Sequence, residues 1–309
     1  MTKRILMSVG PVVLLLLGLG LWWTQPWLNP SQSTDSVRTS SASINSRLET
    51  LSYETDYEGQ SYEKQVVVYQ PDSYQEGQLM NVFYLMHGSG MDNVSFAETM
   101  QPLFDQWIAA GEMEPMLVVF PTYYPDRSFV VSNYSQDYPL NHFFATDEVT
   151  QVLQLVEGRF STHAASTSAA DLEVSRNHRA FGGYSMGGIT TWDVLVENSR
   201  YFHDYMPMAG DSWIDRVTGR SGDEAIAQTL VSGLEANNYG PEDVTIIAMV
   251  GENDGTKYSM IPQIEALRVN TRLFNNRNLI YWENANGGHD QASLEAEVQH
   301  GVPYLFQAK

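Results

Sequence analysis

The stretch RAFGGYSMGG, residues 179–188, decides the fold of this chain. It begins with residues typical of a buried strand, reaches Ser185 in the pattern Gly-x-Ser-x-Gly, and continues into a helical sequence. A serine on such a strand-to-helix turn projects above the sheet beside a helix N-terminus, and the small residues on either side prevent a clash in the strained turn. We therefore predict that Ser185 is a nucleophile.

The segments on both sides of this turn alternate between strand and helix patterns. The predicted strands cover residues 62–70, 81–86, 116–120, 180–183, 205–208, 244–250 and 279–282, and the clearest predicted helices cover 95–110, 147–160 and 261–274. Ser95 and Glu98 form a capping-box pattern at the start of the first helix. This alternation, with nearly all-apolar later strands, predicts one α/β domain whose mostly parallel sheet is covered by helices on both faces.

A serine hydroxyl needs a general base, and in this type of fold the chain order is nucleophile, acid, histidine. His289 follows the last predicted strand in the glycine-containing loop NANGGHD, residues 284–290. His300 lies in the final helical stretch, where a packing or surface role fits better. His289 is therefore the predicted base.

The acid is expected at the end of the strand that precedes the histidine. The run VTIIAMV is followed directly by GEND, which makes Asp254 the predicted acid. Glu252 and Asp290 are nearby alternatives, and Asp211 is a third because some folds of this kind take the acid from an earlier strand. The predicted role of the acid is to hold the tautomer of His289 and stabilise its imidazolium form.

Acyl transfer also needs N–H donors for the oxyanion of the tetrahedral intermediate. One predicted donor is the backbone N–H of Met186, the residue after the nucleophile. The other is a backbone N–H of the HGSG loop, from Gly88 or Ser89. His87, which opens this loop, is predicted to be structural.

Composition narrows the chemistry and the partners. The 309 residues include 17 Lys and Arg against 37 Asp and Glu, and the net charge of −20 opposes binding to nucleic acid. The chain has no cysteine, which excludes disulfides, a thiol nucleophile and an all-cysteine zinc site. No HExxH or EF-hand pattern is present, so neither a metal nor an organic cofactor is expected.

The N-terminal part has a different character. Lys3 and Arg4 precede an apolar run of nineteen residues, 5–23, which as a helix could span a bilayer with the N-terminus in the cytoplasm. We predict a signal anchor at residues 1–28, with a cleaved signal peptide as the alternative. A Ser/Thr-rich linker at 29–48 and a catalytic domain at 49–309 follow, so the expected location is extracytoplasmic, either membrane-anchored or secreted.

Five stretches together resemble carbohydrate esterase family 1, and within it the bacterial feruloyl esterase modules of xylan-degrading systems. They are FYLMHGSGMDN, MEPMLVVFPTYY, SRNHRAFGGYSMGGITTWDV, MPMAGDSW and GGHD. The resemblance runs from about residue 62 to the C-terminus. It implies an α/β-hydrolase fold, a Ser185, His289 and Asp254 triad, an acyl-enzyme, and hydrolysis of feruloyl or related hydroxycinnamoyl esters of xylan. It also implies that Trp213 lines the acyl pocket.

Two features depart from that family. Aromatic residues tend to follow the catalytic histidine in such modules, whereas here Asp290 and Gln291 follow it, a change that favours small acyl groups such as acetyl. The aromatic segment 122–144 is either a lid or sugar platform, or a packed insertion. The alternatives are an acetyl esterase, an acyltransferase with the same triad, or a non-catalytic polysaccharide-binding protein. The expected partners are a small or polysaccharide-linked ester and, through the N-terminal segment, a membrane.

Overall fold

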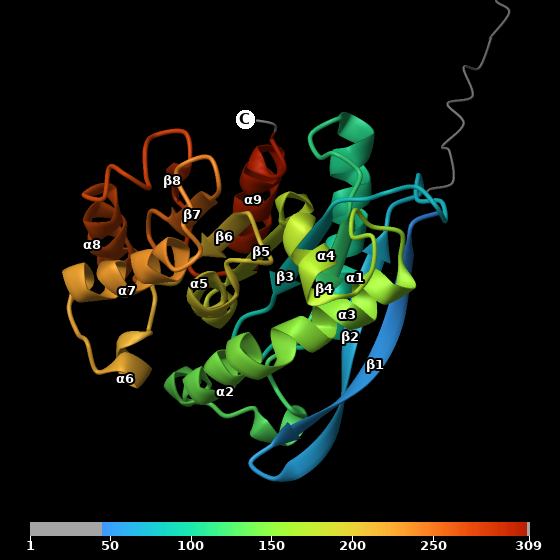
Figure 1. Cartoon of the computed structure of the whole chain (residues 1–309), viewed down its shortest axis with the longest axis horizontal. Coiled ribbons are helices and arrows are strands. Elements are labelled where there is room, and N and C mark those ends of the chain that lie inside the picture. The colour runs from blue at the N-terminus through green and yellow to red at the C-terminus, as the bar shows by residue number, and fades with distance from the viewer. Residues whose placement is uncertain (1–44, 308–309) are drawn as a thin grey trace, which may run out of the picture. The chain divides into compact units, whose positions relative to one another are not determined.

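Residues 45–307 are described by a computed structural model and form one eight-stranded sheet with helices on both faces (Figure 1). The strand order is β1-β2-β4-β3-β5-β6-β7-β8; β2 pairs antiparallel with β1 and β4, and the other pairs are parallel. The strands are β1 (Arg47–Tyr57), β2 (Gln60–Gln70), β3 (Val82–Met86), β4 (Leu117–Phe120), β5 (Arg179–Tyr184), β6 (Asp204–Met208), β7 (Thr245–Gly251) and β8 (Leu279–Asn284). The predicted mostly parallel sheet is confirmed.

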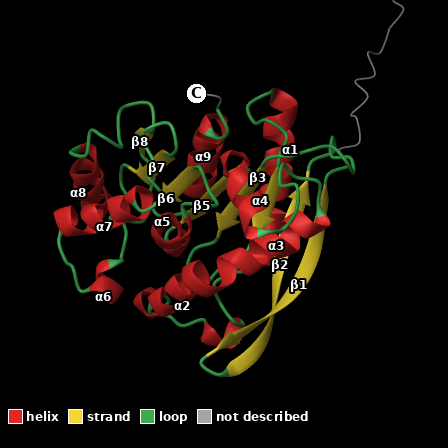
Figure 2. Ribbon diagram, viewed as in Figure 1, coloured by secondary structure: helices red, strands yellow, loops and turns green. Residues whose placement is uncertain are grey.

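Helices cover both faces of the sheet (Figure 2), and each face has its own hydrophobic core. One core contains side chains of α1 (Asn93–Ala110) and α9 (Gln291–Gly301). The other contains side chains of α2 (Tyr138–Phe143), α3 (Val149–Arg159), α4 (Ala169–Val174), α5 (Met186–Asn198), α7 (Asp223–Glu235) and α8 (Lys257–Arg268). A π-helical segment (Phe144–Glu148) joins α2 to α3, and the short α6 (Asp215–Thr218) precedes α7.

The apolar runs in the sequence reflect burial on both faces of this sheet. In β2, Val66 and Val68 belong to one core while Val67 and Tyr69 belong to the other. Successive side chains of a strand point to opposite faces, so a strand covered on both sides needs apolar residues at every position.

Several elements were not predicted from the sequence, among them the strand β1 and the helices α2, α4, α6 and α7. β1 is the edge strand, and most of its side chains are at least partly exposed, so its sequence RLETLSYETDY carries charged residues that hide the strand pattern. The predicted capping box was wrong, because α1 begins at Asn93 and Asp92 is its N-cap. The Asp92 carboxylate accepts hydrogen bonds from both the backbone N–H and the hydroxyl of Ser95, at 2.9 Å each.

The predicted anchor at 1–28 and all but the last four residues of the predicted linker at 29–48 lie outside the described residues. β1 begins at Arg47, two residues before the predicted start of the catalytic domain. Within residues 45–307, no helix combines the length and the apolar character needed to cross a bilayer.

The amino end of β5 is held by a buried ion pair. Arg179, the first residue of the strand, donates to both carboxylate oxygens of Glu157 from α3. The same guanidinium donates to the carbonyls of Leu172 and Tyr201 and to the Ser175 hydroxyl. This network ties α3, α4 and the segment between α5 and β6 to the central strand, at the end opposite Ser185.

Candidate active site

Ser185 lies between the end of β5 and the start of α5, as the sequence predicts. Its backbone has φ 57° and ψ −117°, a conformation that is strained for a residue with a side chain. The backbone N–H of Ser185 donates to the Met208 carbonyl at 2.9 Å, which fixes the turn to β6. A Cβ at Gly187 would lie 2.7 Å from the carbonyl oxygen of His87, so only glycine lets α5 start this close to β3.

His289 joins Ser185 to Asp254 in one hydrogen-bond chain. Its Nε2 lies 2.9 Å from the Ser185 hydroxyl, and its Nδ1 lies 2.7 Å from Oδ2 of Asp254. The ring of Tyr184 packs against the imidazole with the ring centroids 5.0 Å apart. The His289 side chain is 41% exposed, whereas that of Asp254 is buried. A carboxylate, an imidazole and a hydroxyl are thus in contact at the carboxyl edge of the sheet.

The second oxygen of Asp254 is also occupied. Oδ1 accepts hydrogen bonds from the backbone N–H and the hydroxyl of Thr256, both at 2.8 Å. Burial raises the pKa of Asp254, but the hydrogen bonds from His289 and Thr256 outweigh it and hold the pKa below its usual value. Asp254 is therefore ionised at neutral pH and accepts a hydrogen bond from Nδ1–H of the imidazole.

The other carboxylates considered from the sequence have different partners. Glu252 accepts the backbone N–H of Asn286, and Asp290 caps α9 by accepting the N–H of Ser293. Asp211 hydrogen-bonds with the side chain of Trp213, and burial raises its pKa to about 6.

His300 is also outside the chain of hydrogen bonds. Its ring stacks on Trp282 with the centroids 4.0 Å apart. The structure therefore brings together Ser185, Asp254 and His289, and none of the alternatives.

The HGSG loop packs against Ser185. A Cβ on Gly88 would lie 3.3 Å from Cβ of Ser185, so the loop backbone runs beside it. His87 is buried, and burial lowers its pKa to about 4, so the ring is neutral. Its Nδ1–H donates to the Gly88 carbonyl and its Nε2 accepts from the Thr122 hydroxyl, each at 2.8 Å. His87 thus shapes the loop.

Met186 is the first residue of α5 and is buried. The first N–H groups of an α-helix have no partner within the helix, so this amide is available to an anion beside Ser185. The two predicted sources of oxyanion donors, Met186 and the Gly88–Ser89 segment, therefore both lie beside Ser185.

The aromatic segment 122–144 is largely a packed insertion. Tyr123, Tyr124 and Tyr138 are buried, and Phe129 packs edge-on against Tyr57 of β1, with ring centroids 5.8 Å apart. The segment also holds Asp137, which is fully buried and bonded to Ser89. Sequence reasoning missed Asp137 because a single acidic residue in a polar and aromatic stretch has no distinguishing pattern.

Trp213 lies on the segment that follows β6. A Cβ on Gly210 of this segment would lie 2.7 Å from the carbonyl oxygen of Ser185, so the segment passes directly beside Ser185. The half-buried Trp213 ring lies 6.1 Å from the ring of Tyr134, which is 59% exposed. The Arg216 guanidinium packs on the Trp213 ring, with its Cζ atom 3.6 Å from the ring centroid. Together Trp213 and Tyr134 form a partly exposed aromatic surface.

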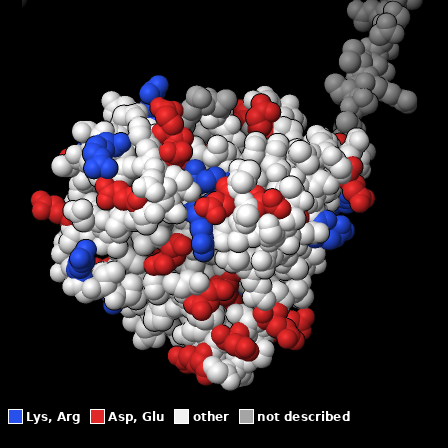
Figure 3. Space-filling view, viewed as in Figure 1, with Lys and Arg blue, Asp and Glu red and all other residues white. Residues whose placement is uncertain are grey.

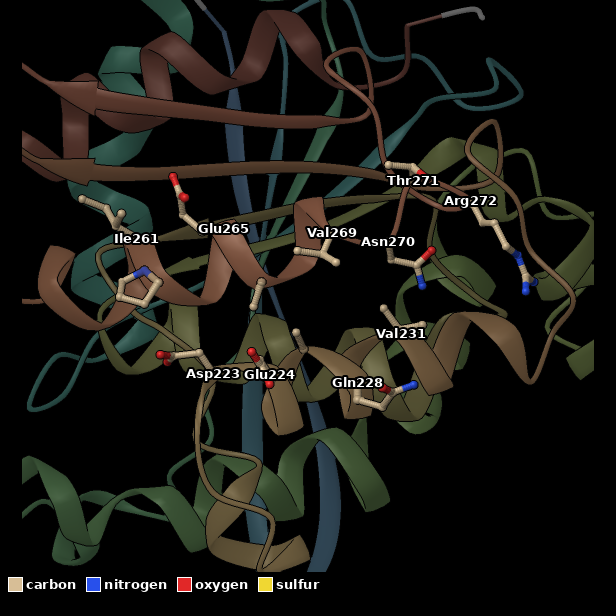
Figure 4. A pocket seen from close by; sticks show the side chains of 13 residues that line it. Asp223, Glu224, Gln228, Val231, Ile261, Glu265, Val269, Asn270, Thr271 and Arg272 are labelled. Atoms are coloured by element: carbon tan, nitrogen blue, oxygen red, sulfur yellow. The ribbon is translucent and has the colours of Figure 1, made fainter.

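A hollow of about 1050 Å³ lies between α7 and α8 (Figure 4). Its lining includes Asp223, Gln228, Glu265 and Arg272, but none of the residues of the Ser185 hydrogen-bond chain. Because it lacks a hydroxyl–imidazole pair, we do not identify it as the reactive site.

Among residues 45–307, no group of three His, Asp or Glu side chains is arranged to hold a metal ion. Acidic side chains are spread over much of the face seen in Figure 3.

Comparisons with known proteins agree with this geometry. A family model described as putative esterase matches residues 61–301. Endo-1,4-beta-xylanase Y of Acetivibrio thermocellus is 31% identical over 258 residues, which make up 81% of this chain and 22% of that protein. The chain thus spans about a fifth of the length of this curated relative.

Solved structures extend the comparison. A feruloyl esterase module from Clostridium thermocellum, complexed with sinapinate, has a TM-score of 0.71 and 28% identity, covering 84% of this chain and 88% of that one. A ferulic acid esterase from Anaeromyces mucronatus has a TM-score of 0.61 over 88% and 95% of the two chains; at 17% identity it shows the fold alone. The resemblance to feruloyl esterase modules noted in the sequence is confirmed.

Proposed function

Because the chain belongs to the putative esterase family and is a feruloyl-esterase-like carboxylic ester hydrolase, we propose that it cleaves hydroxycinnamoyl esters of plant cell-wall polysaccharide with a Ser-His-Asp triad. The observation that carries the mechanism is the position of His289, 2.9 Å from the Ser185 hydroxyl and 2.7 Å from Asp254. The acyl group is proposed from the relative complexed with sinapinate.

In the first half of the proposed reaction, the Ser185 oxygen attacks the ester carbonyl carbon while Nε2 of His289 accepts the hydroxyl proton. Asp254 keeps the Nδ1 proton in place and stabilises the imidazolium. The oxyanion accepts hydrogen bonds from the Met186 N–H and from the Gly88–Ser89 segment. The C–O bond to the alcohol then breaks, and His289 gives its proton to the departing oxygen, leaving an acyl-enzyme.

In the second half, water attacks the acyl-enzyme. His289 accepts a proton from the water, the same donors hold the second oxyanion, and the proton returns to the Ser185 oxygen as the acid leaves. No metal or organic cofactor takes part in this scheme. An alcohol that replaced the water would make the protein an acyltransferase.

Trp213 and Tyr134 are proposed to bind the aromatic ring of the acyl group. Their rings lie 6.1 Å apart, and a phenolic ring can stack on such a surface. The polar residues Asp290 and Gln291 do not argue against an aromatic acyl group. The Asp290 side chain caps α9, and the Gln291 side chain bonds to Glu295 at 2.9 Å. Their polar character is explained by the helix start.

The proposed location is extracytoplasmic, with the N-terminal segment as an anchor or signal peptide. The support is the basic pair Lys3 and Arg4 before the apolar run at 5–23. Protease added to intact cells that express the full chain is expected to degrade the catalytic domain, and full protection would refute this location.

The test of the function compares the purified chain with its Ser185→Ala variant on methyl ferulate and on 4-nitrophenyl acetate. Hydrolysis of both, with a higher kcat/KM for methyl ferulate and no activity in the variant, supports the proposal. Cleavage of the acetate alone would keep the triad and refute the acyl group. A variant as active as the wild type would refute Ser185 as the nucleophile. Product analysis with an added alcohol acceptor separates hydrolysis from transfer.

A further inference from the structure

We propose that Asp137 is a positioning residue for the HGSG loop, and that it sets the geometry of the second oxyanion donor without touching the substrate. The proposal rests on the proposed function for its catalytic consequence. Its structural part, a buried carboxylate that holds the loop, stands on contacts alone.

Asp137 collects hydroxyl donors from the loop and from the insertion. Its Oδ2 accepts the Ser89 hydroxyl at 2.5 Å and the Tyr124 hydroxyl at 2.7 Å, with the Tyr123 hydroxyl at 3.4 Å. The Tyr124 oxygen in turn accepts the backbone N–H of Gly90 at 3.0 Å. Two consecutive loop residues are therefore tied, directly and through one tyrosine, to a single carboxylate.

Burial makes this arrangement rigid. Asp137 is fully buried and Tyr124 is 2% exposed, so water cannot readily replace the hydroxyl donors. Oδ1 of Asp137 has no hydrogen-bond partner within residues 45–307, so the hydrogen bonds of the carboxylate all pass through Oδ2. A buried carboxylate that lost its donors would carry a large desolvation cost, which keeps the hydroxyls in place.

The peptide between Gly88 and Ser89 is consequently fixed from two sides. Its carbonyl accepts Nδ1–H of His87 at 2.8 Å, and the Ser89 side chain is held by Asp137. In a planar trans peptide the N–H points opposite to the carbonyl, so the Ser89 N–H is directed away from the His87 ring. The Gly90 N–H is already used by Tyr124, which leaves Gly88 and Ser89 as the loop amides for the oxyanion.

The helix α2, which begins directly after Asp137, contacts Met186, the residue whose N–H is the other predicted donor. Asn141 of α2, four residues after Asp137, donates from Nδ2 to the Met186 carbonyl at 3.3 Å and to the Thr190 hydroxyl at 2.7 Å. The insertion therefore contacts both sources of oxyanion donors. A shift of the loop relative to α5 would change the distance between the two donors, and an oxyanion hole depends on that distance.

The first experiment measures kcat and KM for Asp137→Asn, Ser89→Ala and the double variant. Each single variant is expected to lower kcat about 10- to 100-fold, less than or equal to the loss of a whole oxyanion donor, with KM changed less than about 3-fold. Because Asp137 acts through Ser89, the kcat of the double variant is expected to equal that of the less active single variant, and the two losses are not expected to multiply. Multiplied losses, or an unchanged kcat in Asp137→Asn, would overturn the proposal.

Asp105→Asn is the matched control. Asp105 on α1 also accepts a serine and a tyrosine hydroxyl, from Ser46 at 2.7 Å and Tyr69 at 2.8 Å, but it lies in the layer on the other face of the sheet. Its kcat is expected to stay within about 2-fold of the wild type. A loss in the control equal to that in Asp137→Asn would assign both effects to general destabilisation and overturn the positioning role.

A second measurement does not depend on activity. Hydrogen exchange of the backbone amides at 87–91 is expected to be at least about 10-fold faster in Asp137→Asn than in the wild type, and unchanged in Asp105→Asn. Unchanged exchange in both variants would overturn the positioning role even in an active enzyme. A wild type without esterase activity, combined with faster exchange in Asp137→Asn, would refute the proposed function and leave the structural part intact.

Discussion

The two ends of strand β5 hold their polar side chains in opposite ways. At the amino end, the buried guanidinium of Arg179 makes five hydrogen bonds, two of them to Glu157. At the carboxyl end, Ser185 has a strained backbone, and the His289 side chain beside it is 41% exposed. One strand therefore joins a closed network of charges to an open hydrogen-bond chain.

The difference reflects what each end must do. A buried ion pair with every donor satisfied has no free proton to move and no room for a ligand, so it serves the fold. A reactive serine needs an approachable oxygen and an imidazole that can change its protonation state. The strain at Ser185 is tolerated because the central strands β3 to β7 are buried between the two hydrophobic cores and hold the turn in place.

The largest expected effect is at the carboxyl end of β5. His289→Ala is expected to lower kcat/KM for ester hydrolysis by at least about 10⁴-fold, because the serine loses its base. The melting temperature should change little, since the side chain is partly exposed. His300→Ala is the control and should keep activity within about 2-fold. Comparable losses in both variants would contradict the assignment of the base.

The next largest effect is expected at the amino end of β5. Arg179→Met is expected to destabilise the domain by about 3–5 kcal/mol in urea unfolding, because it leaves the buried Glu157 carboxylate without its cation. The kcat of the remaining folded protein should be unchanged. Arg159→Met removes a cation that is exposed in its pair with Glu49, and should cost less than about 1 kcal/mol. Similar losses in the two variants would show that burial does not distinguish the pairs.

A third prediction compares the paired Glu157 with Glu297 on α9, which is fully buried and has no hydrogen-bond partner within the described residues. Burial, with smaller contributions from Asp254 and Asp290, raises the pKa of Glu297 to about 8. The folded state then holds this proton more tightly than the unfolded state, so stability falls as pH rises through the window from about 4.5 to 8.

Glu297→Gln removes this dependence. Its stability relative to the wild type is expected to rise by up to about 1.4 kcal/mol per pH unit across that window, and to level off above it. Urea unfolding at pH 5, 6.5 and 8 measures the difference. Glu295→Gln, on the same helix but half-exposed, should run parallel to the wild type. If the stability of Glu297→Gln also ran parallel to that of the wild type across this pH window, the Glu297 carboxyl would not have a raised pKa in solution, and the prediction would be wrong.

The smallest expected effect concerns the aromatic surface. Trp213→Ala is expected to raise KM for methyl ferulate about 10-fold and to leave 4-nitrophenyl acetate within about 2-fold, because only the larger acyl group reaches the indole. Equal changes for both substrates would argue against stacking. Trp282→Ala, which removes an indole that stacks on His300, is the control.

Much of the fold and of the hydrogen-bond chain could be predicted from the sequence. The Gly-x-Ser-x-Gly turn is a local pattern, and the chain order of nucleophile, acid and histidine pointed to Asp254 and His289 although they lie 69 and 104 residues from Ser185. The edge strand β1 escaped because its alternation is interrupted by charged residues. The choice among four carboxylates depended on their partners, which only the folded chain shows.

The sequence by itself determined a parallel α/β sheet, its strand-to-helix turn at Ser185 and the kinds of groups available, because apolar periodicity and turn chemistry are local properties of the chain. Only the tertiary structure decided that Asp290 caps a helix, that the aromatic segment packs, and that Asp137 reaches Ser89 across 48 residues. These outcomes depend on which side chains become buried together, and burial is a property of the whole fold.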